Sequence, residues 1–390
     1  MADIPIVVVA YNRIESLKRI LGSLLQAEYS AQGAELIISI DRGDNADVLD
    51  YARAFSWPFG EKQVIYQEKN LGLKAHILKC GGLTQAHDGI ILLEDDLYVS
   101  PDFYRYALEC YDFVADKPEI AGVALYNHRL SQLTEKVFEP LEDGFDNWYF
   151  RYACSWGQMW TKAQWAAFSA WLAENGDYDF AASEKIPAHI KDWGKHSWLK
   201  YHIAFVIETS RLFLYPRVAR CTCFSDAGVN FSKKESTFQV PLMLGGRREK
   251  LRLSEPGESR AVYDAWMENL WLRSFLGRES LCVDLYGAKE TFEGQQYLLT
   301  SSRVENAELL ECFGREMRPQ EWNVLSSVPG DELRLYKLTE NAKKIPAARR
   351  DRMADVAYHI RGISYPYKKT IFAMFIQESV AKLRKKMHLA

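Results

Sequence analysis

The first hundred residues alternate between short apolar runs and amphipathic patterns, and this alternation limits the fold more than any other feature of the chain. Continuous apolar runs, typical of strands buried on both faces of a sheet, occupy residues 4–10, 36–40, 64–66 and 90–93. Between them, apolar residues recur at helical spacing in residues 14–24, 48–54 and 74–87. Strands that alternate with helices in this way predict an α/β fold, in which helices flank a mainly parallel sheet.

Charged residues stand just after three of these predicted strands. Arg13 follows the first strand, Asp41 follows the second, and Glu94-Asp95-Asp96 follows the run at 90–93. In a parallel sheet the carboxyl ends of the strands share one edge, and ligands bind beyond that edge. We therefore expect these residues to meet in one crevice, although they are far apart in the sequence.

The acidic triplet is the strongest chemical signal in the sequence. Because an apolar run leads into it, three ionised carboxylates are costly there unless a cation or hydrogen bonds compensate them. Mg2+ or Mn2+ prefers such oxygen ligands and leaves coordination positions free for diphosphate oxygens and water. A capping and turn cluster between a strand and a helix is the alternative interpretation. The position at the carboxyl end of a strand favours a ligand site.

The absence of several phosphate-binding motifs limits the kinds of phosphate-containing ligand that the chain is expected to bind. No GxGxxG follows the first strand, and GxxxxGK[ST], HExxH and GxSxG are absent, so dinucleotide binding and P-loop hydrolysis lose their main signatures. Seven of the eleven tryptophans fall within residues 148–198: Trp148, Trp156, Trp160, Trp165, Trp171, Trp193 and Trp198. Core packing explains most of them, but aromatic faces also bind pyranose rings. A metal-held diphosphate beside such a segment indicates a nucleotide-sugar ligand.

Residues 93–103, Leu-Glu-Asp-Asp-Leu-Tyr-Val-Ser-Pro-Asp-Phe, look like one family's variant of the DXD motif and the helix after it. That family is the GT-A nucleotide-sugar glycosyltransferases, most closely the N-acetylglucosaminyltransferase I type and related bacterial sugar transferases. Residues 4–13 and 36–41 are similar in order and spacing, and the resemblance covers roughly residues 4–235. It implies a GT-A fold, which is a Rossmann-like mixed and mainly parallel sheet flanked by helices. It also implies a UDP-sugar donor held with Mn2+ or Mg2+.

The same resemblance implies roles for individual residues on the donor side. Asp96 would be the direct metal ligand, while Glu94-Asp95 would hold the ribose and the water shell of the metal. Asp41 would accept a hydrogen bond from the uracil imide, and Arg13 would lie beside the nucleotide. His76 lies on the helix where the family has a donor-contacting histidine. Alternatively, it is a helix residue whose hydrogen bonds are made within the protein and which contacts no ligand.

Two segments resemble the acceptor side of the family. Residues 155–160 look like its acceptor turn, and Lys191-Asp192-Trp193 resembles the Asp-Trp that supplies its catalytic base. The resemblance makes Asp192 the base, with a helix cap or a surface acid as the alternative, and Trp156 and Trp193 the contacts of the acceptor sugar. Nearby acids that could replace Asp192 are Asp177, Asp179 and Glu184. Partial burial by Trp193 and Trp198 would raise the pKa of Asp192 towards the range that a base needs.

Further along, residues 215–217 and 224–230 resemble the strand and the mobile loop that close over the donor in the family. Lys233 and Lys234 follow in the same polar segment, where a solvated pair is favoured over a contact with the diphosphate.

Composition divides the chain into four parts. A GT-A domain is predicted at 1–240, with a donor half of about 1–130 and an acceptor half of about 131–240. A linker rich in Gly, Pro and charge follows at 241–260, then a small α+β appendage at 261–345 and a basic, amphipathic tail helix within 346–390.

The positive charge of the chain gathers at its C-terminal end. The net charge is −3, but residues 341–390 hold 12 Lys and Arg against 3 Asp and Glu, a sum of +9, so the first 340 residues carry −12. The acidic body argues against a nucleic-acid groove. Because the tail helix sets apolar residues beside lysines, it fits either an anionic membrane surface or packing on the appendage.

The opening of the chain lacks a basic leader, and no run reaches the ~18 apolar residues of a membrane span. Seven cysteines without zinc-type spacing indicate reduced thiols. We therefore expect a cytoplasmic protein, peripheral on the inner face of the membrane if the tail binds lipid.

Together these features predict a metal-dependent glycosyltransferase that moves a sugar from a UDP-sugar to a hydroxyl of a glycan or lipid-linked acceptor. Bacterial surface polysaccharide or glycoconjugate synthesis is the expected setting, and inversion at the anomeric carbon is implied by the resemblance alone. The alternatives are a metal-dependent hydrolase of a glycoside or phosphoester, and a non-catalytic carbohydrate-binding protein.

Overall fold

The computed structural model describes residues 2–30, 33–226, 236–245, 249–292, 294–364 and 367–387. The chain divides into two compact units, Met1–Glu279 with Ala288–Thr291, and Ser280–Gly287 with Phe292–Ala390. The boundary lies further along the chain than the linker predicted at 241–260, because part of that stretch binds to the first unit. The backbone N–H of Arg252 donates to Asp146 (2.8 Å) and that of Ser254 donates to Asn147 (2.9 Å).

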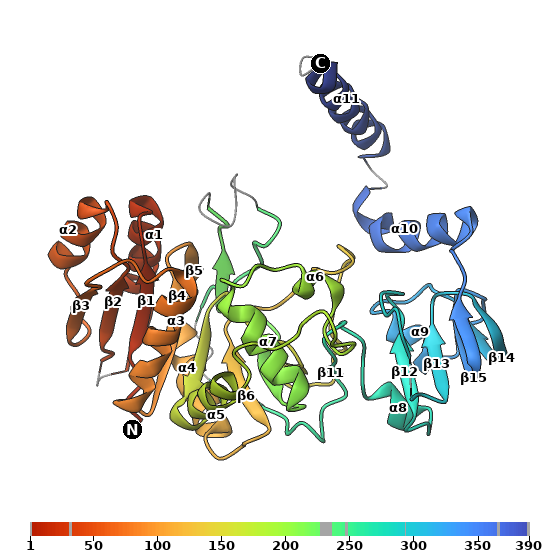
Figure 1. Ribbon diagram of the computed structural model, residues 1–390, viewed down its shortest axis with the longest axis horizontal. Coiled ribbons are helices and arrows are strands. Elements are labelled where there is room, and N and C mark those ends of the chain that lie inside the picture. The colour runs from red at the N-terminus through yellow and green to blue at the C-terminus, as the bar shows by residue number, and fades with distance from the viewer. Residues whose placement is uncertain are drawn as a thin grey trace. The chain divides into compact units, whose positions relative to one another are not determined.

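A large sheet forms the centre of the first unit (Figure 1), and its described strands follow the order β11-β7-β9-β6-β8-β4-β1-β2-β3. These strands are β1 (Ile6–Ala10), β2 (Leu36–Ile40), β3 (Lys62–Tyr66), β4 (Gly89–Glu94), β6 (Ile120–Ala124), β7 (Asn147–Phe150), β8 (Gln158–Thr161), β9 (Leu212–Pro216) and β11 (Val262–Tyr263). Five of its eight strand pairs are parallel and three are antiparallel. A separate pair, β5 (Leu97–Val99) with β10 (Cys221–Cys223), is antiparallel.

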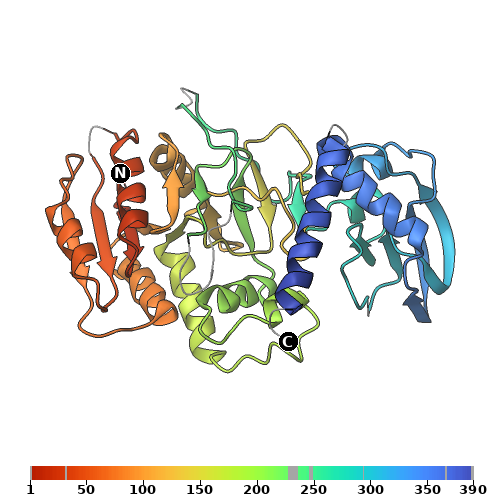
Figure 2. The same cartoon turned by 90° about the horizontal axis from the view of Figure 1, so that it is seen from above.

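Helices cover both faces of this sheet, as Figures 1 and 2 show. The first unit contains α1 (Ile14–Leu25), α2 (Ala46–Ala54), α3 (Leu73–Gly81), η1 (Gly82–Gln85), α4 (Phe103–Val114), α5 (Lys162–Glu174), α6 (Ala188–Lys191), α7 (Trp198–Glu208) and α8 (Leu272–Phe275). Apolar residues of α1, α2 and α4 share one core with β1, β2 and β4, while α7 contacts both α3 and α5. The predicted α/β class, a mainly parallel sheet flanked by helices, is confirmed.

The elements predicted within residues 4–93 are found within a few residues of their expected positions. The sequence predicts a helix around residues 262–275 at the start of the appendage. This prediction is wrong in its first part, because Val262–Tyr263 pairs with β7 as β11 and only Leu272–Phe275 is helical. Tyr263 is fully buried there, and its hydroxyl accepts a hydrogen bond from the backbone N–H of Leu141 (2.8 Å). Burial of this aromatic side chain against the sheet favours the strand over the helix.

The second unit contains a four-stranded sheet among its described residues, in the order β12-β13-β15-β14. Its elements are β12 (Leu281–Asp284), β13 (Tyr297–Thr300), β14 (Val304–Phe313), α9 (Glu321–Leu325), β15 (Leu333–Lys344), α10 (Arg349–Ser364) and α11 (Lys368–Met387). Within the described part of the chain, no helix is both long enough and apolar enough to cross a membrane.

Candidate functional site

The carboxyl ends of β1, β2 and β4 meet at one edge of the large sheet. These strands are parallel, and Val9 of β1 is in register with Ser39 on one side and Glu94 on the other. Residues that leave the three strands therefore emerge side by side. Arg13, Asp41 and residues 94–96 therefore leave the sheet at the same edge.

Arg13 binds two of the acids of the triplet. Its Nε donates to Asp95 Oδ2 (3.3 Å) and its Nη1 donates to Asp96 Oδ2 (3.1 Å), while Nη2 contacts the second oxygen of Asp95. Asp95 and Asp96 are only 3% and 7% exposed. A forked guanidinium suits a pair of carboxylates, so Arg13 compensates two charges that burial would otherwise disfavour.

Asp226 joins the same group, although no pattern in the sequence singles it out. Its carboxylate accepts a hydrogen bond from Ser16 Oγ (2.8 Å) and pairs with Arg19, and its backbone oxygen accepts from Arg13 Nη1 (3.2 Å). Asp226 follows β10, which pairs with β5 directly after the triplet. The pairing of residues 221–223 with residues 97–99 sets this position, and it is a tertiary contact that no sequence pattern indicates.

We call this group the acid–arginine cluster; its members are Arg13, Arg19, Glu94, Asp95, Asp96 and Asp226. Burial raises the pKa of Glu94 to about 8, helped by the neighbouring Asp96, although part of Glu94 still reaches solvent. Burial also raises the pKa of Asp95 to about 6 and that of Asp96 above its usual range, against the effect of Arg13. Burial alone would lower the pKa of Arg13, but Asp95 and Asp96 raise it. The arginines of the cluster therefore do not fully compensate the buried negative charge of its acids.

The excess of negative charge in the cluster bears on whether a divalent cation fits there. Four carboxylates and two guanidinium groups give the acid–arginine cluster a formal charge of −2 when every acid is ionised. All of the acidic side chains offer oxygen donors, which hard cations such as Mn2+ or Mg2+ prefer. The residues present fit such an ion in charge and in donor type, but among the described residues no three of these carboxylates bring an oxygen within 4.8 Å of one another.

Asp41 and His76 lie together beside this edge, and both have protein partners. The carboxylate of Asp41 accepts from the backbone N–H groups of Leu71 and Gly72, each at 2.9 Å. His76 Nε2 lies 2.8 Å from Ser39 Oγ, and burial lowers the pKa of His76 while the charge of Asp41 opposes that shift. Gly72, with a φ of 75°, has the left-handed conformation that glycine adopts most easily at the start of α3.

A row of aromatic rings joins the two predicted acceptor residues. We call it the aromatic row; its members are Trp156, His128, Tyr152, His189 and Trp193. Successive ring centroids lie 5.7, 6.1, 6.4 and 5.9 Å apart along this order. The structure therefore connects Trp156 with Trp193 although 37 positions separate them in the sequence.

Asp192 lies directly after α6 and is exposed. The partial burial expected for it is wrong, because Trp198 is only 2% exposed and packs inward against Trp160 instead of covering the carboxylate. Lys200, which the sequence analysis did not single out, holds this turn: its Nζ donates to the backbone oxygens of Lys191 and Trp193, each at 2.7 Å. Asp192 thus stands on a fixed turn with its carboxylate in solvent.

The acid–arginine cluster and the start of the aromatic row lie on neighbouring strands. β4 pairs with β8 in antiparallel fashion and Leu92 is in register with Gln158. Glu94, at the end of β4, and Trp156, just before β8, therefore lie at the same edge of the sheet. Most of the predicted closing loop, including Lys233 and Lys234, lies outside the described residues.

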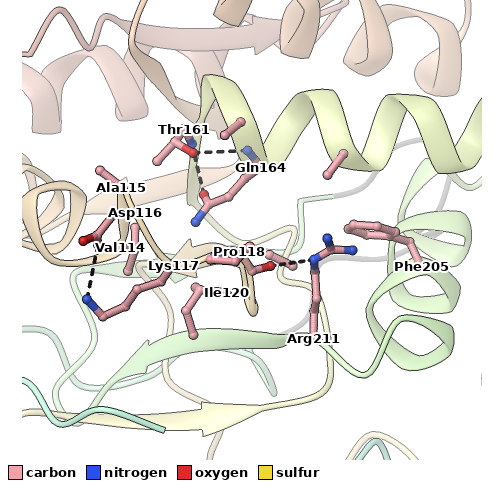
Figure 3. A pocket seen from close by; sticks show the side chains of 13 residues that line it. Val114, Ala115, Asp116, Lys117, Pro118, Ile120, Thr161, Gln164, Phe205 and Arg211 are labelled. Carbon is pink, nitrogen blue, oxygen red and sulfur yellow. Dashed lines mark hydrogen bonds and ion pairs between the residues drawn. The ribbon is translucent and has the colours of Figure 1, made fainter.

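A separate cavity of about 250 Å³ lies away from these groups, between α4, α5, α7 and the start of β6 (Figure 3). Thr161 and Gln164 lie on its wall, where they exchange hydrogen bonds at the start of α5 (3.0 and 3.2 Å). Because β6 runs in the same direction as β4, its first residue, Ile120, lies at the amino edge of the sheet. The cavity is therefore at the edge opposite the acid–arginine cluster.

A second acidic group also lies at that amino edge. Carboxylate oxygens of Asp3 and Glu35 and a ring nitrogen of His87 fall within 4.8 Å of one another. His87 Nδ1 lies 2.7 Å from Asp3 Oδ2, so a histidine–carboxylate pair accounts for the arrangement.

No family model matches the chain, and no curated protein matches it. Among solved structures it is similar to a mannosyltransferase from Pyrobaculum calidifontis in complex with GDP-Man and Mn2+, at 12% identity and a TM-score of 0.37 over 58% of each chain. It is also similar to residues 1–349 of S. aureus TarS, at 10% identity and a TM-score of 0.34 over 56% of this chain and 60% of that one. GalNAc-T7 with UDP, GalNAc and Mn2+ gives 11% identity and a TM-score of 0.39 over 55% and 43%. The chain thus spans less than two thirds of each, and at this similarity its function has to be inferred from its own residues.

Proposed function

We propose that the protein is a metal-dependent glycosyltransferase that moves a sugar from a UDP-sugar to a hydroxyl group of a glycan or lipid-linked acceptor. One observation carries the proposal: four acids and two arginines converge at the carboxyl edge of a mainly parallel sheet, where such sheets bind ligands. An excess of buried negative charge at this edge suits a cation that in turn binds a diphosphate.

On the donor side, Asp96 would hold a Mn2+ or Mg2+ ion, and Glu94-Asp95 would hold the ribose and the water shell of the metal. When bound, the ion supplies positive charge for the oxygens of the departing diphosphate. Arg13 pairs with Asp95 and Asp96 through separate nitrogens, so it keeps both carboxylates in place and stands beside the nucleotide. Asp41 accepts a hydrogen bond from the uracil imide, and His76 supports the same pocket from α3.

On the acceptor side, Asp192 removes the proton from the acceptor hydroxyl as its oxygen attacks the anomeric carbon. The bond from that carbon to the diphosphate oxygen breaks on the opposite face, which gives inversion. Trp156 and Trp193, at the two ends of the aromatic row, present ring faces to the acceptor sugar. Lys200 positions Asp192 through its hydrogen bonds to the backbone of the turn.

Calorimetric titration of UDP into the full chain, with Mn2+ or with EDTA, tests the donor site. We expect UDP to bind with Mn2+ and to lose at least about a hundredfold in affinity in EDTA or in Asp96→Ala, because the cation links the acids to the diphosphate. Asp116→Ala is the matched control, since Asp116 is an exposed acid elsewhere in the same unit. Equal UDP binding with EDTA and Mn2+ would contradict the proposal.

Turnover of a UDP-sugar with and without added glycan acceptors separates the proposal from its two alternatives. A glycosyltransferase releases UDP faster when acceptor is present and forms a glycosylated product. A hydrolase releases sugar or phosphate to water at a rate that does not depend on acceptor. A carbohydrate-binding protein turns over no donor and binds sugar equally well after Asp96→Ala.

A further inference from the structure

In the last helix, α11, several of the described apolar side chains are exposed to solvent. Phe372, Phe375 and Ile376 are 68%, 64% and 49% exposed, and Val380 is 41% exposed. These are large apolar groups at helical spacing, the kind that a folded protein usually covers. Their exposure shows that the described part of the chain does not cover them.

The exposure extends around the helix. Met374 is 56% exposed, and Gln377, which lies away from Phe372 and Phe375 around α11, is exposed as well. A helix that packed its apolar stripe on the sheet of its own unit would bury that stripe and expose only the rest. The described apolar side chains at 372–380 are therefore not packed on the appendage, which is one of the two roles left open by the sequence.

The charge of α11 indicates what could cover it. Its sequence holds six Lys and Arg against one Glu, and residues 341–390 as a whole sum to +9. An apolar protein surface would not require this charge. A bilayer rich in anionic lipid offers both an apolar interior for phenylalanine and isoleucine and negative headgroups for lysine and arginine.

We propose that α11 binds the surface of an anionic lipid bilayer, with Phe372, Phe375 and Ile376 entering the boundary between headgroups and acyl chains. The positive charge that the sequence gives to the same helix attracts it to the headgroups. The observations behind this interaction belong to the second unit and involve no residue of the acid–arginine cluster. A result that contradicts membrane binding would therefore leave the glycosyltransferase proposal unchanged, and the reverse also holds.

Co-sedimentation of the full chain with vesicles tests the interaction. Vesicles of phosphatidylcholine with one third phosphatidylglycerol should bind the protein, and pure phosphatidylcholine vesicles should bind it roughly tenfold or more weakly, because each basic residue near an anionic surface contributes. Raising the salt to 0.5 M should remove most of the difference by screening. The double variant Phe372→Ser/Phe375→Ser should lower partition to the anionic vesicles about tenfold or more.

Leu309→Ser/Trp322→Ser is the matched control, because these apolar residues of the same unit are also exposed, at 51% and 40%. The control should bind vesicles like the unchanged protein, and all variants should keep the same circular dichroism and the same UDP affinity. Equal binding to neutral and anionic vesicles, or an equal loss in the control, overturns the proposal. So does light scattering that shows a dimer which becomes monomeric in Phe372→Ser/Phe375→Ser while no vesicle binding is seen.

Discussion

The acid–arginine cluster and the aromatic row differ in how their polar groups are held. In the cluster, Asp95 and Asp96 are buried and share one guanidinium, and Asp226 is paired with Arg19. In the aromatic row, His128 is buried with no partner for its Nε2 among the described residues, and neighbouring Asp192 is exposed. The first region is held by charge, whereas the second is held mainly by ring packing.

This difference indicates how the work would be divided in a transferase. A diphosphate and its cation have fixed charge, so a rigid, pre-arranged set of charges suits the donor side. An acceptor sugar offers hydroxyl groups and apolar ring faces, which suit aromatic surfaces and an accessible base. The comparison leads to three predictions, and the first concerns the largest effect.

Replacing Asp192 by Asn should lower kcat about 10²- to 10⁴-fold, because the amide cannot take the proton of the acceptor hydroxyl. The affinity for UDP should stay unchanged, since Asp192 lies on the turn after α6 and not in the acid–arginine cluster. Steady-state kinetics with a responsive acceptor, together with UDP titration, would measure both quantities.

Asp179→Asn and Glu184→Gln are the matched variants for this test, because both residues are exposed acids of the same segment. They should keep kcat within about threefold of the unchanged enzyme. If one of them abolished turnover while Asp192→Asn remained active, the base would have to be reassigned and the aromatic row would no longer mark the acceptor side.

Replacing Arg13 by Met should lower the free energy of unfolding by about 3–5 kcal/mol in the absence of metal, because two buried carboxylates lose their common partner. Mn2+ should recover part of this loss if the cluster binds a cation, since the ion supplies the missing charge. Urea unfolding with Mn2+ and with EDTA would measure both effects.

Arg53→Met serves as the control for that measurement, because Arg53 is an exposed arginine of α2. It should change stability by no more than about 0.5 kcal/mol. A loss of the same small size in Arg13→Met would mean that the cluster is not held by charge, and the contrast between the two regions would fail.

The same two regions show how much the sequence could predict. The triplet, Arg13 and Asp41 were predictable as neighbours, because apolar strands of a parallel sheet bring their carboxyl ends to one edge whatever their separation in the chain. Asp226 was not predictable in this way, since its position depends on the antiparallel pairing of β10 with β5. That pairing joins residues more than a hundred positions apart and leaves no periodic signal.

Around the aromatic row, the sequence predicted which residue types gather but not which of them are covered. Trp198 was expected to shield Asp192, yet it packs against Trp160 and His202. Composition cannot decide the direction in which a tryptophan points, because either packing buries a similar apolar area. Lys200 was not predictable either, because a lysine is usually expected at the surface. Only the structure shows its hydrogen bonds to the backbone of the turn.

The smallest predicted effect concerns His128 in the aromatic row. Burial lowers its pKa to about 3, whereas a histidine in an unfolded chain has a pKa of about 6.5. Between pH 3 and pH 6.5 the unfolded state binds a proton that the folded state does not. The free energy of unfolding is therefore unaffected by His128 above about pH 6.5 and decreases as the pH falls below that value. From pH 7 to pH 5 the free energy of unfolding should fall by about 2 kcal/mol, at roughly 1.4 kcal/mol for each pH unit below 6.5.

His128→Phe should reduce the acid sensitivity measured by urea unfolding by that amount, whereas the exposed His196, changed to Gln, should leave it unaltered. If His128→Phe kept the full pH dependence, the histidine would have a proton acceptor in the folded state, and the aromatic row would resemble the acid–arginine cluster more closely than its ring contacts indicate.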